Sequence, residues 1–190
     1  MNDAGLSDET LMARYARGDA GAFTALYRRH ELRIWRYLER NAGSRATAEE
    51  LMQEVWFAVA RDAERYRPTA RFTTWLFTIA RNRVIDAARA SRPHLSLDVV
   101  GHEAETVVEP LTADADAGPA AAAEARDQAV ALRQALARLP PEQRDAFLLQ
   151  LEGDLSVEEV ASVTRASFET VKSRLRYART RLRELLSEYA

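Results

Sequence analysis

Apolar residues near the end of the chain follow a spacing that places them on one face of a helix. They are Phe168, Val171, Leu175, Ala178, Leu182 and Leu185, separated by alternate steps of three and four. Because an α-helix turns once in about 3.6 residues, this spacing forms a single apolar stripe that other parts of the fold must cover. The same steps recur in the first half of the chain, and its 190 residues include only 7 Gly and 6 Pro. The sequence therefore predicts an all-α fold.

Capping residues divide the first half of the chain into four predicted helices. Ser7 is suited to open a helix that runs to Arg17, and Asp19 to open a second one. A third helix is predicted to start at the capping box Thr47–Glu50, and a fourth lies between residues 71 and 92. A proline pair, Pro140 and Pro141, ends one helix of the second half and starts the next.

The middle of the chain has a different composition. Residues 93–129 contain three prolines, one Arg, eight acidic residues and no aromatic residue. Such a segment cannot bury enough apolar surface to offset the entropy lost on ordering, so residues 93–128 are predicted to be a flexible acidic linker. The flanking regions are mildly basic, with net charges of +4 for residues 1–92 and +1 for residues 130–190, within a chain of net charge -2. We therefore expect two small helical domains, residues 1–92 and 129–190, tethered by this linker.

The C-terminal part predicts a helix-turn-helix. A short helix opens at the capping box Ser156–Glu159, residues 164–166 form the turn, and Ser167 caps the last helix. From residue 165 to residue 183, seven of nineteen residues are basic and one is acidic, and most lie off the apolar stripe. This face suits the phosphates and base edges of duplex DNA, although a solvated arginine-rich helix is the alternative. Arg165 lies where such turns usually have Gly, which predicts a left-handed backbone there.

Two further stretches are candidate surfaces. In residues 71–92, aromatic residues alternate with arginines, a combination that suits the stacking of unpaired bases. We expect residues 65–74 and the helix after them to hold such bases. The alternative is that Phe72, Trp75 and Phe77 belong to the core, which we favour for Trp75. In residues 46–56, acidic and amide residues share one helix face, and the spacing of Leu51 leaves Phe57 on the same side as the acids. An exposed aromatic residue among carboxylates fits an interface with a basic helix, while charge alone favours a solubilising face.

Several classes of function find no support in the sequence. The absence of cysteine excludes disulfides and thiolate metal sites. The start of the chain lacks the basic and apolar segments of a signal peptide, and no apolar run reaches the length of a membrane span, so we expect a cytoplasmic protein without membrane insertion. No Gly-rich phosphate loop, HExxH or GxSxG motif occurs, and we predict neither enzymatic activity nor a cofactor nor a metal. His30 lies on an apolar helix face and is expected in the core.

Three stretches, in this order, resemble the extracytoplasmic-function sigma factors of bacterial RNA polymerase, which belong to the sigma-70 family. AEELMQE, from Ala48, resembles the polymerase-binding helix of that family, and TTWLFTIARNRVID, from Thr73, resembles its promoter-melting helix. LSVEEVASVTRASFETVKSRLRYARTRLRELL, from Leu155, resembles its helix-turn-helix, with TVKSRL as the most specific part. The resemblance covers residues 11–92 and 130–186, and it departs from the family pattern at Tyr177, where Arg is frequent.

The resemblance implies a site for each of three contacts. The first domain would bind the clamp coiled coil of the polymerase beta-prime subunit and capture unpaired minus-ten bases, and the second would read the minus-thirty-five duplex and contact the beta flap. The implied core-binding residues are Glu49, Glu50, Gln53, Glu54 and Phe57. The implied minus-ten residues are Arg71, Phe72, Thr74, Trp75, Arg81, Asn82, Arg83 and Asp86. The implied minus-thirty-five residues are Ser167, Thr170, Lys172, Ser173, Arg174, Arg176, Tyr177 and Arg179.

The family also implies an anti-sigma factor as a partner, and a linker that enters the polymerase toward the RNA exit path. Two other functions remain open from the residues alone. One is a helix-turn-helix regulator with an unrelated helical sensor domain, which would bind duplex DNA without polymerase. The other is a helical adaptor that binds only proteins, which would show no salt-dependent affinity for DNA.

Overall fold

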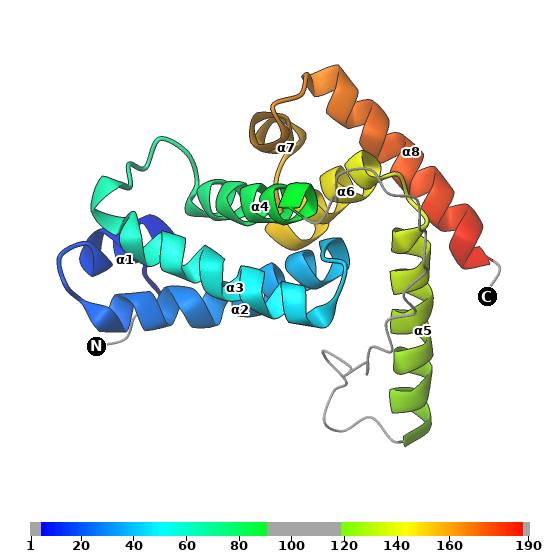
Figure 1. Cartoon of the computed structure of the whole chain (residues 1–190), viewed down its shortest axis with the longest axis horizontal. Coiled ribbons are helices and arrows are strands. Elements are labelled where there is room, and N and C mark those ends of the chain that lie inside the picture. The colour runs from blue at the N-terminus through cyan, green and yellow to red at the C-terminus, as the bar shows by residue number, and fades with distance from the viewer. Residues whose placement is uncertain (1–4, 91–118, 188–190) are drawn as a thin grey trace.

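The computed structural model describes residues 5–90 and 119–187, and every regular element in these ranges is helical (Figure 1). The α-helices are α1 Asp8–Tyr15, α2 Ala20–Asn41, α3 Arg45–Arg61, α4 Phe72–Ala90, α5 Pro119–Ala137, α6 Pro141–Gly153, α7 Val157–Thr164 and α8 Phe168–Ser187. A short 3-10 helix, η2, covers Ala63–Arg65. The predicted all-α fold is confirmed.

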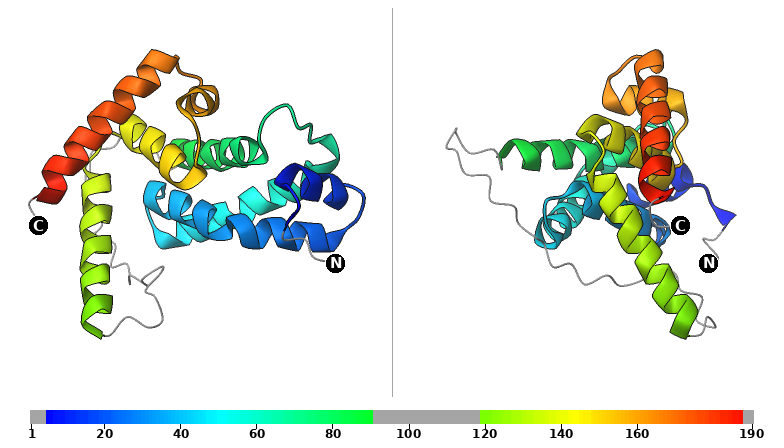
Figure 2. Two further views of the ribbon diagram at one scale, coloured as in Figure 1. Left: turned by 180° about the vertical axis from the view of Figure 1, so that it is seen from behind. Right: turned by 90° about the vertical axis from the view of Figure 1, so that its right-hand side faces the viewer.

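The predicted linker overlaps one of these helices. Helix α5 begins at Pro119, so the second helical part starts well before residue 129, where the sequence prediction placed it. Proline at the first helical position and the run Ala120–Ala123 both favour a helix, and this local propensity outweighs the acidic surroundings. Residues 93–118 of the predicted linker lie outside the described residues. Helix α5 extends away from the other helices, and its C-terminal end lies near α8 (Figures 1 and 2).

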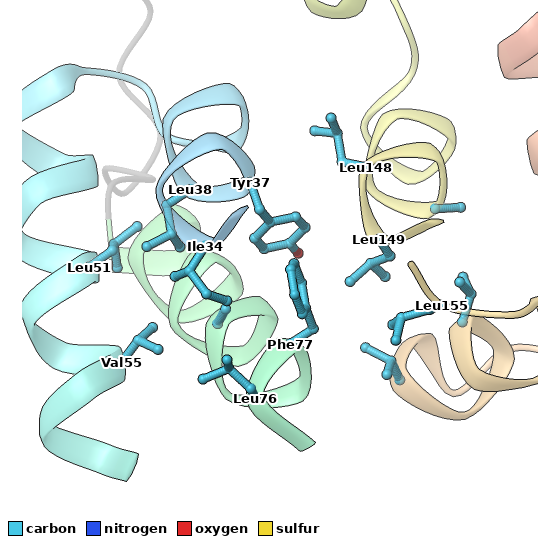
Figure 3. Close-up of a cluster of buried hydrophobic side chains, with 14 of the residues drawn as sticks. Ile34, Tyr37, Leu38, Leu51, Val55, Leu76, Phe77, Leu148, Leu149 and Leu155 are labelled. Carbon is cyan, nitrogen blue, oxygen red and sulfur yellow. The ribbon is translucent and has the colours of Figure 1, made fainter. Parts of the chain in front are cut away.

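Helices α2, α3 and α4 run alongside one another and enclose the first core (Figures 1 and 3). Its buried side chains include Leu26, Ile34, Leu38, Leu51, Val55, Val59 and Leu76. His30 belongs to the same core, as predicted, and is 2% exposed. Its Nε2 atom lies 2.7 Å from Asp8 Oδ2, which joins α1 to α2. Burial opposes the charge of Asp8, but hydrogen bonds and charges from His30 and Arg29 outweigh it and lower the Asp8 pKa.

The starts of α3 and α4 are capped by residues that the sequence analysis did not identify as their caps. The predicted capping box Thr47–Glu50 is wrong, because α3 begins at Arg45 and Ser44 is its N-cap, accepting a hydrogen bond from the Thr47 backbone N–H. Both Ser44 and Thr47 are cap-forming residues, and the pattern does not tell which of them opens the helix. The start of α4 is held from a distance, since Glu9 of α1 accepts a hydrogen bond from the Phe72 backbone N–H at 2.9 Å.

The second domain contains the predicted helix-turn-helix. Ser156 and Glu159 form the capping box of α7, and Arg165 ends α7 with φ 55°, in the left-handed conformation that its position predicted. The stripe on α8 is buried from Val171 to Leu185, but Phe168 is 41% exposed. Phe168 is the first residue of α8.

The two domains pack directly on each other along a seam between α2 and α4 on one side and α6 and α7 on the other. Tyr37 and Phe77 are fully buried there, with Leu149 and Leu155 facing them (Figure 3). The sequence predicts two tethered domains and leaves open whether they pack on each other. The composition of the linker indicates how the domains are joined, but it carries no information on whether their surfaces are complementary.

Candidate nucleic-acid and protein interfaces

The first candidate surface is the outward side of α8. Ser167 caps the helix by accepting a hydrogen bond from the Thr170 backbone N–H, and both residues are exposed. Lys172 is exposed, and its ammonium group lies 6.0 Å from the centre of the Phe168 ring. The two exposed aromatic rings therefore lie beside cations, since Arg176 lies 4.9 Å from the centre of the Tyr177 ring. Such a surface can contact phosphates and base edges in a major groove.

Other predicted residues of α8 are partly engaged within the second domain. Arg174 is only 25% exposed and lies 3.5 Å from the Glu142 carboxylate of α6. Arg179 donates a hydrogen bond to the side chain of Gln150, which also lies on α6. Ser173 is half-buried. The structure therefore presents Lys172 and Arg176 openly, while Arg174 would have to leave Glu142 to reach DNA.

The second candidate surface, around α4, differs more from the predicted set. Phe72 is fully buried, with its ring 5.5 Å from that of His30, so the predicted contact of Phe72 with DNA is not compatible with this arrangement. Thr74 is 6% exposed, and Trp75 is half-buried rather than a full member of the core. Asn82 and Asp86 are exposed on the far part of the helix. The pattern of the sequence places all of these residues on α4 but does not indicate which of them other helices cover.

A cleft of about 320 Å³ lies at the loop before α4. Its lining residues are Asp62, Arg65, Tyr66, Arg67 and Trp75. The rings of Tyr66 and Trp75 are 4.9 Å apart, and the buried Tyr66 hydroxyl has no hydrogen-bond partner among the described residues. Burial raises the pKa of Tyr66 to about 12, so this hydroxyl keeps its proton at neutral pH. The cleft offers aromatic surface and cations, which are groups that bind an unstacked base.

Arg65, Tyr66 and Arg67 belong to the segment, residues 65–74, that the sequence predicts to hold unstacked bases, although they are not among the individually predicted minus-ten residues. The signal was present in the sequence RYR at residues 65–67, an aromatic residue between two arginines just before a proline. The sequence predicts a turn or loop here, and it does not indicate that Trp75 joins these residues in one cleft, because that contact forms only when the loop folds back.

The third candidate surface is the outer face of α3, where the core-facing and outward residues separate as predicted. Leu51, Val55 and Val59 are buried, while Glu49, Glu50, Gln53 and Glu54 are exposed. Phe57 is 72% exposed, the largest exposed fraction among the large apolar side chains of the described residues. It lines an open cleft of about 420 Å³ together with Glu54, Ala58, Arg61 and Arg83. Arg83 of α4 lies 3.7 Å from the Glu54 carboxylate, so this surface and α4 are adjacent.

Three residues predicted to bind the minus-ten strand instead contact the second domain. Arg81 forms an ion pair with Asp145 of α6 at 2.7 Å, and Thr74 donates a hydrogen bond to Glu159 of α7 at 2.7 Å. Arg71 lies 3.4 Å from the same Glu159 carboxylate. Burial opposes the charge of Glu159, but hydrogen bonds from the Ser156 backbone N–H and from Thr74, together with Arg71, lower its pKa.

Comparison with known proteins identifies the family. Residues 26–93 match the family model of sigma-70 region 2, and residues 129–182 match that of sigma-70 region 4. The chain is 32% identical over 177 residues to the RNA polymerase sigma factor CarQ of Myxococcus xanthus, covering 93% of this chain and 96% of CarQ. It is also 32% identical over 170 residues to the ECF RNA polymerase sigma factor RpoE of Cereibacter sphaeroides, covering 89% and 88% of the two chains. This chain is an extracytoplasmic-function sigma factor of the sigma-70 family.

Solved structures agree with the fold of this sigma factor. CnrH, solved in complex with the cytosolic domain of CnrY, superposes with a TM-score of 0.67 at 22% identity, covering 96% of this chain and 99% of CnrH. The sigma factor RpoE of Bartonella quintana, solved with the anti-sigma factor NepR, gives a TM-score of 0.62 at 23% identity, covering 87% and 96%. Among the residues described here, no helix of the sigma factor is long and apolar enough to cross a membrane.

Proposed function

We propose that this sigma factor binds core RNA polymerase and directs promoter-specific initiation of transcription. The observation that carries the proposal is the exposed Phe57, which lies beside Glu54 on α3 and next to α4. Glu49, Glu50 and Gln53 of α3 are exposed as well. An exposed aromatic ring on a helix face that also presents carboxylates provides an apolar anchor with a charged rim, which suits a basic helix such as one strand of a coiled coil. The partner we assign to this surface is the clamp coiled coil of the beta-prime subunit.

In this proposal, the cleft before α4 holds unstacked bases of the minus-ten element. Tyr66 and Trp75 supply stacking surfaces, and Arg65 and Arg67 supply charge for the backbone of the strand. Asn82, which is exposed further along α4, extends the same surface. A site of this kind favours melted over paired DNA, because a base must leave the duplex stack before it can enter the cleft.

The minus-thirty-five element is assigned to α8. Lys172 and Arg176 lie near the helix start with their charges exposed, which is the part of a recognition helix that reaches base edges. The beta flap is a further proposed contact of the second domain. The complexes of CnrH with CnrY and of RpoE with NepR support an anti-sigma factor as a partner and a cytoplasmic location.

The polymerase contact is tested by reversing one charge on α3. Glu54 is about half exposed, so Glu54→Arg should alter the free energy of unfolding by no more than about 0.5 kcal/mol. The same change places a cation against the basic partner, and we expect capture of core polymerase in a pull-down to fall at least about tenfold. Thermal melting of the isolated protein, measured in parallel, separates lost binding from lost fold.

Glu158→Arg serves as the matched control, because it makes the same charge reversal at an exposed position of α7, far from α3. It should capture core polymerase as well as the parent. Equal capture by Glu54→Arg and the parent would contradict the α3 assignment. A chain that captured no polymerase at all would instead be a DNA-binding regulator or a protein adaptor.

A further inference from the structure

A cleft of about 300 Å³ lies where the turn between α2 and α3 meets helices α5 and α6 (Figure 1). Four arginines line it, and each comes from a different helix: Arg40 from α2, Arg45 from α3, Arg133 from α5 and Arg144 from α6. Among the described residues of its lining, Glu39 alone is acidic. None of the four arginines belongs to the three candidate surfaces. A concave site of this size, lined mainly by one sign of charge, suits a small ligand of the opposite charge.

Three of these arginines already have a carboxylate partner. The pairs are Arg40 with Glu152 of α6, Arg45 with Glu49 of α3 at 3.0 Å, and Arg133 with Glu39 of α2 at 3.1 Å. The carboxylates hold these guanidinium groups at the cleft and offset most of their charge. Because a guanidinium group has five N–H donors, a paired arginine still has donors for a second anion.

The fourth arginine, Arg144, is the cation that the fold leaves unpaired. Its side chain is half-buried, its buried Nε atom has no hydrogen-bond partner, and it forms no ion pair with a described residue. Asp145, its neighbour in the chain, accepts hydrogen bonds from Tyr37 and Arg81 instead. Burial lowers the pKa of Arg144, although the charge of Asp145 opposes this shift. A cation that has lost water without gaining a partner is costly to the fold, and an anion in the cleft would offset that cost.

The turn between α2 and α3 leaves open space at the cleft. A Cβ built at Gly43 would meet nothing within 4 Å, so a ligand can approach the backbone there. Ser44 follows as the N-cap of α3, and the positive end of this helix dipole adds to the attraction for an anion. Leu136 and Ala137 of α5 add apolar lining. A ligand that matches all of these groups has an anionic end and an apolar part.

We propose that this cleft binds a small molecule that carries a phosphate group, and that Arg144 pairs with the phosphate. A phosphate offers three strong acceptor oxygens, which can satisfy Arg144 together with spare donors of the neighbouring arginines. A carboxylate has only two oxygen atoms and would satisfy fewer of these donors. The volume of the cleft is that of a site for one small ligand rather than for a strand of nucleic acid. Because the site is separate from the three candidate surfaces, it is tested without polymerase or promoter DNA.

Phenyl phosphate is the probe, because it joins a phosphate to an apolar ring. Its affinity for the full-length protein is measured from its phosphorus NMR signal during titration at constant ionic strength. Arg144→Gln removes the unpaired charge and should weaken binding at least about tenfold. The matched control is Arg28→Gln, which makes the same change at an exposed position of α2, about 18 Å along the helix from Arg40. The control should bind the probe as the parent does.

A second pair of variants adds charge instead of removing it. Gly43→Asp places a carboxylate in the open space of the cleft, and Gly43→Asn places a side chain of the same shape there without the charge. We expect Gly43→Asp to bind phenyl phosphate at least about fivefold more weakly than Gly43→Asn, because like charges then meet in the cleft. Neither variant removes a native side-chain contact, so this pair still decides the matter if Arg144→Gln does not fold.

A parent protein that does not bind phenyl phosphate would overturn the proposal, and so would equal affinities of the parent, Arg144→Gln and Gly43→Asp. Benzoate, which has a carboxylate in place of the phosphate, should bind more weakly than phenyl phosphate, and equal binding of the two would overturn the choice of phosphate. A short DNA strand without terminal phosphates should not displace the probe. Displacement by that strand would assign the cleft to a nucleic-acid backbone and overturn the small-molecule ligand.

Discussion

At the scale of single residues, the charges of α8 are not equivalent. Arg174 is held near Glu142, and Arg179 is bonded to Gln150, so both have partners within their own domain. Lys172 is exposed near the start of the helix, beside the Phe168 ring. The seven basic residues that the sequence gathers between positions 165 and 183 therefore divide into groups that support the fold and groups that are available to a polyanion.

Replacement of Lys172 by alanine should weaken sequence-specific binding of a minus-thirty-five duplex by about 1–3 kcal/mol, if the ammonium group reaches a base edge. Replacement of Arg183, which is exposed near the end of α8, should weaken binding to all duplexes alike. Fluorescence anisotropy with promoter and scrambled duplexes at several salt concentrations measures both effects. A Lys172→Ala variant that lost affinity equally for the two duplexes would place Lys172 on phosphates instead.

At the scale of helices, the first turns of α3 and α4 are each capped by a residue that lies outside the helix. Ser44 caps α3 from the end of the preceding turn, and Glu9 of α1 bonds the first backbone N–H of α4. Helices α3 and α4 carry two of the three candidate surfaces, so these caps also fix where those surfaces begin. A capping group satisfies N–H groups that have no acceptor inside the helix.

Ser44→Ala should therefore lower the free energy of unfolding by about 1 kcal/mol, the usual effect of removing an N-cap side chain. The control is Thr47→Ala, which removes a hydroxyl that bonds to the Ser44 hydroxyl but caps nothing itself. Its effect should be smaller than that of Ser44→Ala in urea denaturation. The reverse order would restore Thr47 as the residue that opens α3.

At the scale of the whole molecule, the seam makes one packed structure from two family regions. Phe77 is fully buried because α6 and α7 lie over it, and Gly153 at the end of α6 approaches its ring closely. A Cβ added at Gly153 would lie 2.9 Å from Leu155 Cγ and 3.4 Å from Phe77 Cδ2. Neither atom can move without shifting the buried apolar side chains of the seam.

Gly153→Ala is accordingly expected to lower the free energy of unfolding by about 1–3 kcal/mol, the usual effect of overpacking a core. Gly43→Ala is the control, because a Cβ at Gly43 meets nothing within 4 Å, and this variant should be as stable as the parent. Thermal and urea denaturation of both variants give the comparison. Equal stability of the two variants would show that the seam is too loose to resist an added methyl group.

The sequence by itself determined the local structure of this protein. Apolar spacing predicted the buried faces of α3 and α8, and the Ser156–Glu159 box predicted the start of α7. The position of Arg165 predicted its left-handed backbone. These features depend on residues within a few positions of one another, where helical geometry fixes which side chains meet.

Only the tertiary structure decided which candidate residues are accessible. The helical pattern assigns Phe72, Thr74 and Arg81 to the same candidate surface. In the structure, Phe72 lies in the core, and Thr74 and Arg81 form hydrogen bonds across the seam. The cleft of Tyr66 and Trp75 likewise forms only when a loop folds back on a helix. Contacts between residues far apart in sequence depend on how two surfaces match in shape and charge, and no periodicity along the chain records that match.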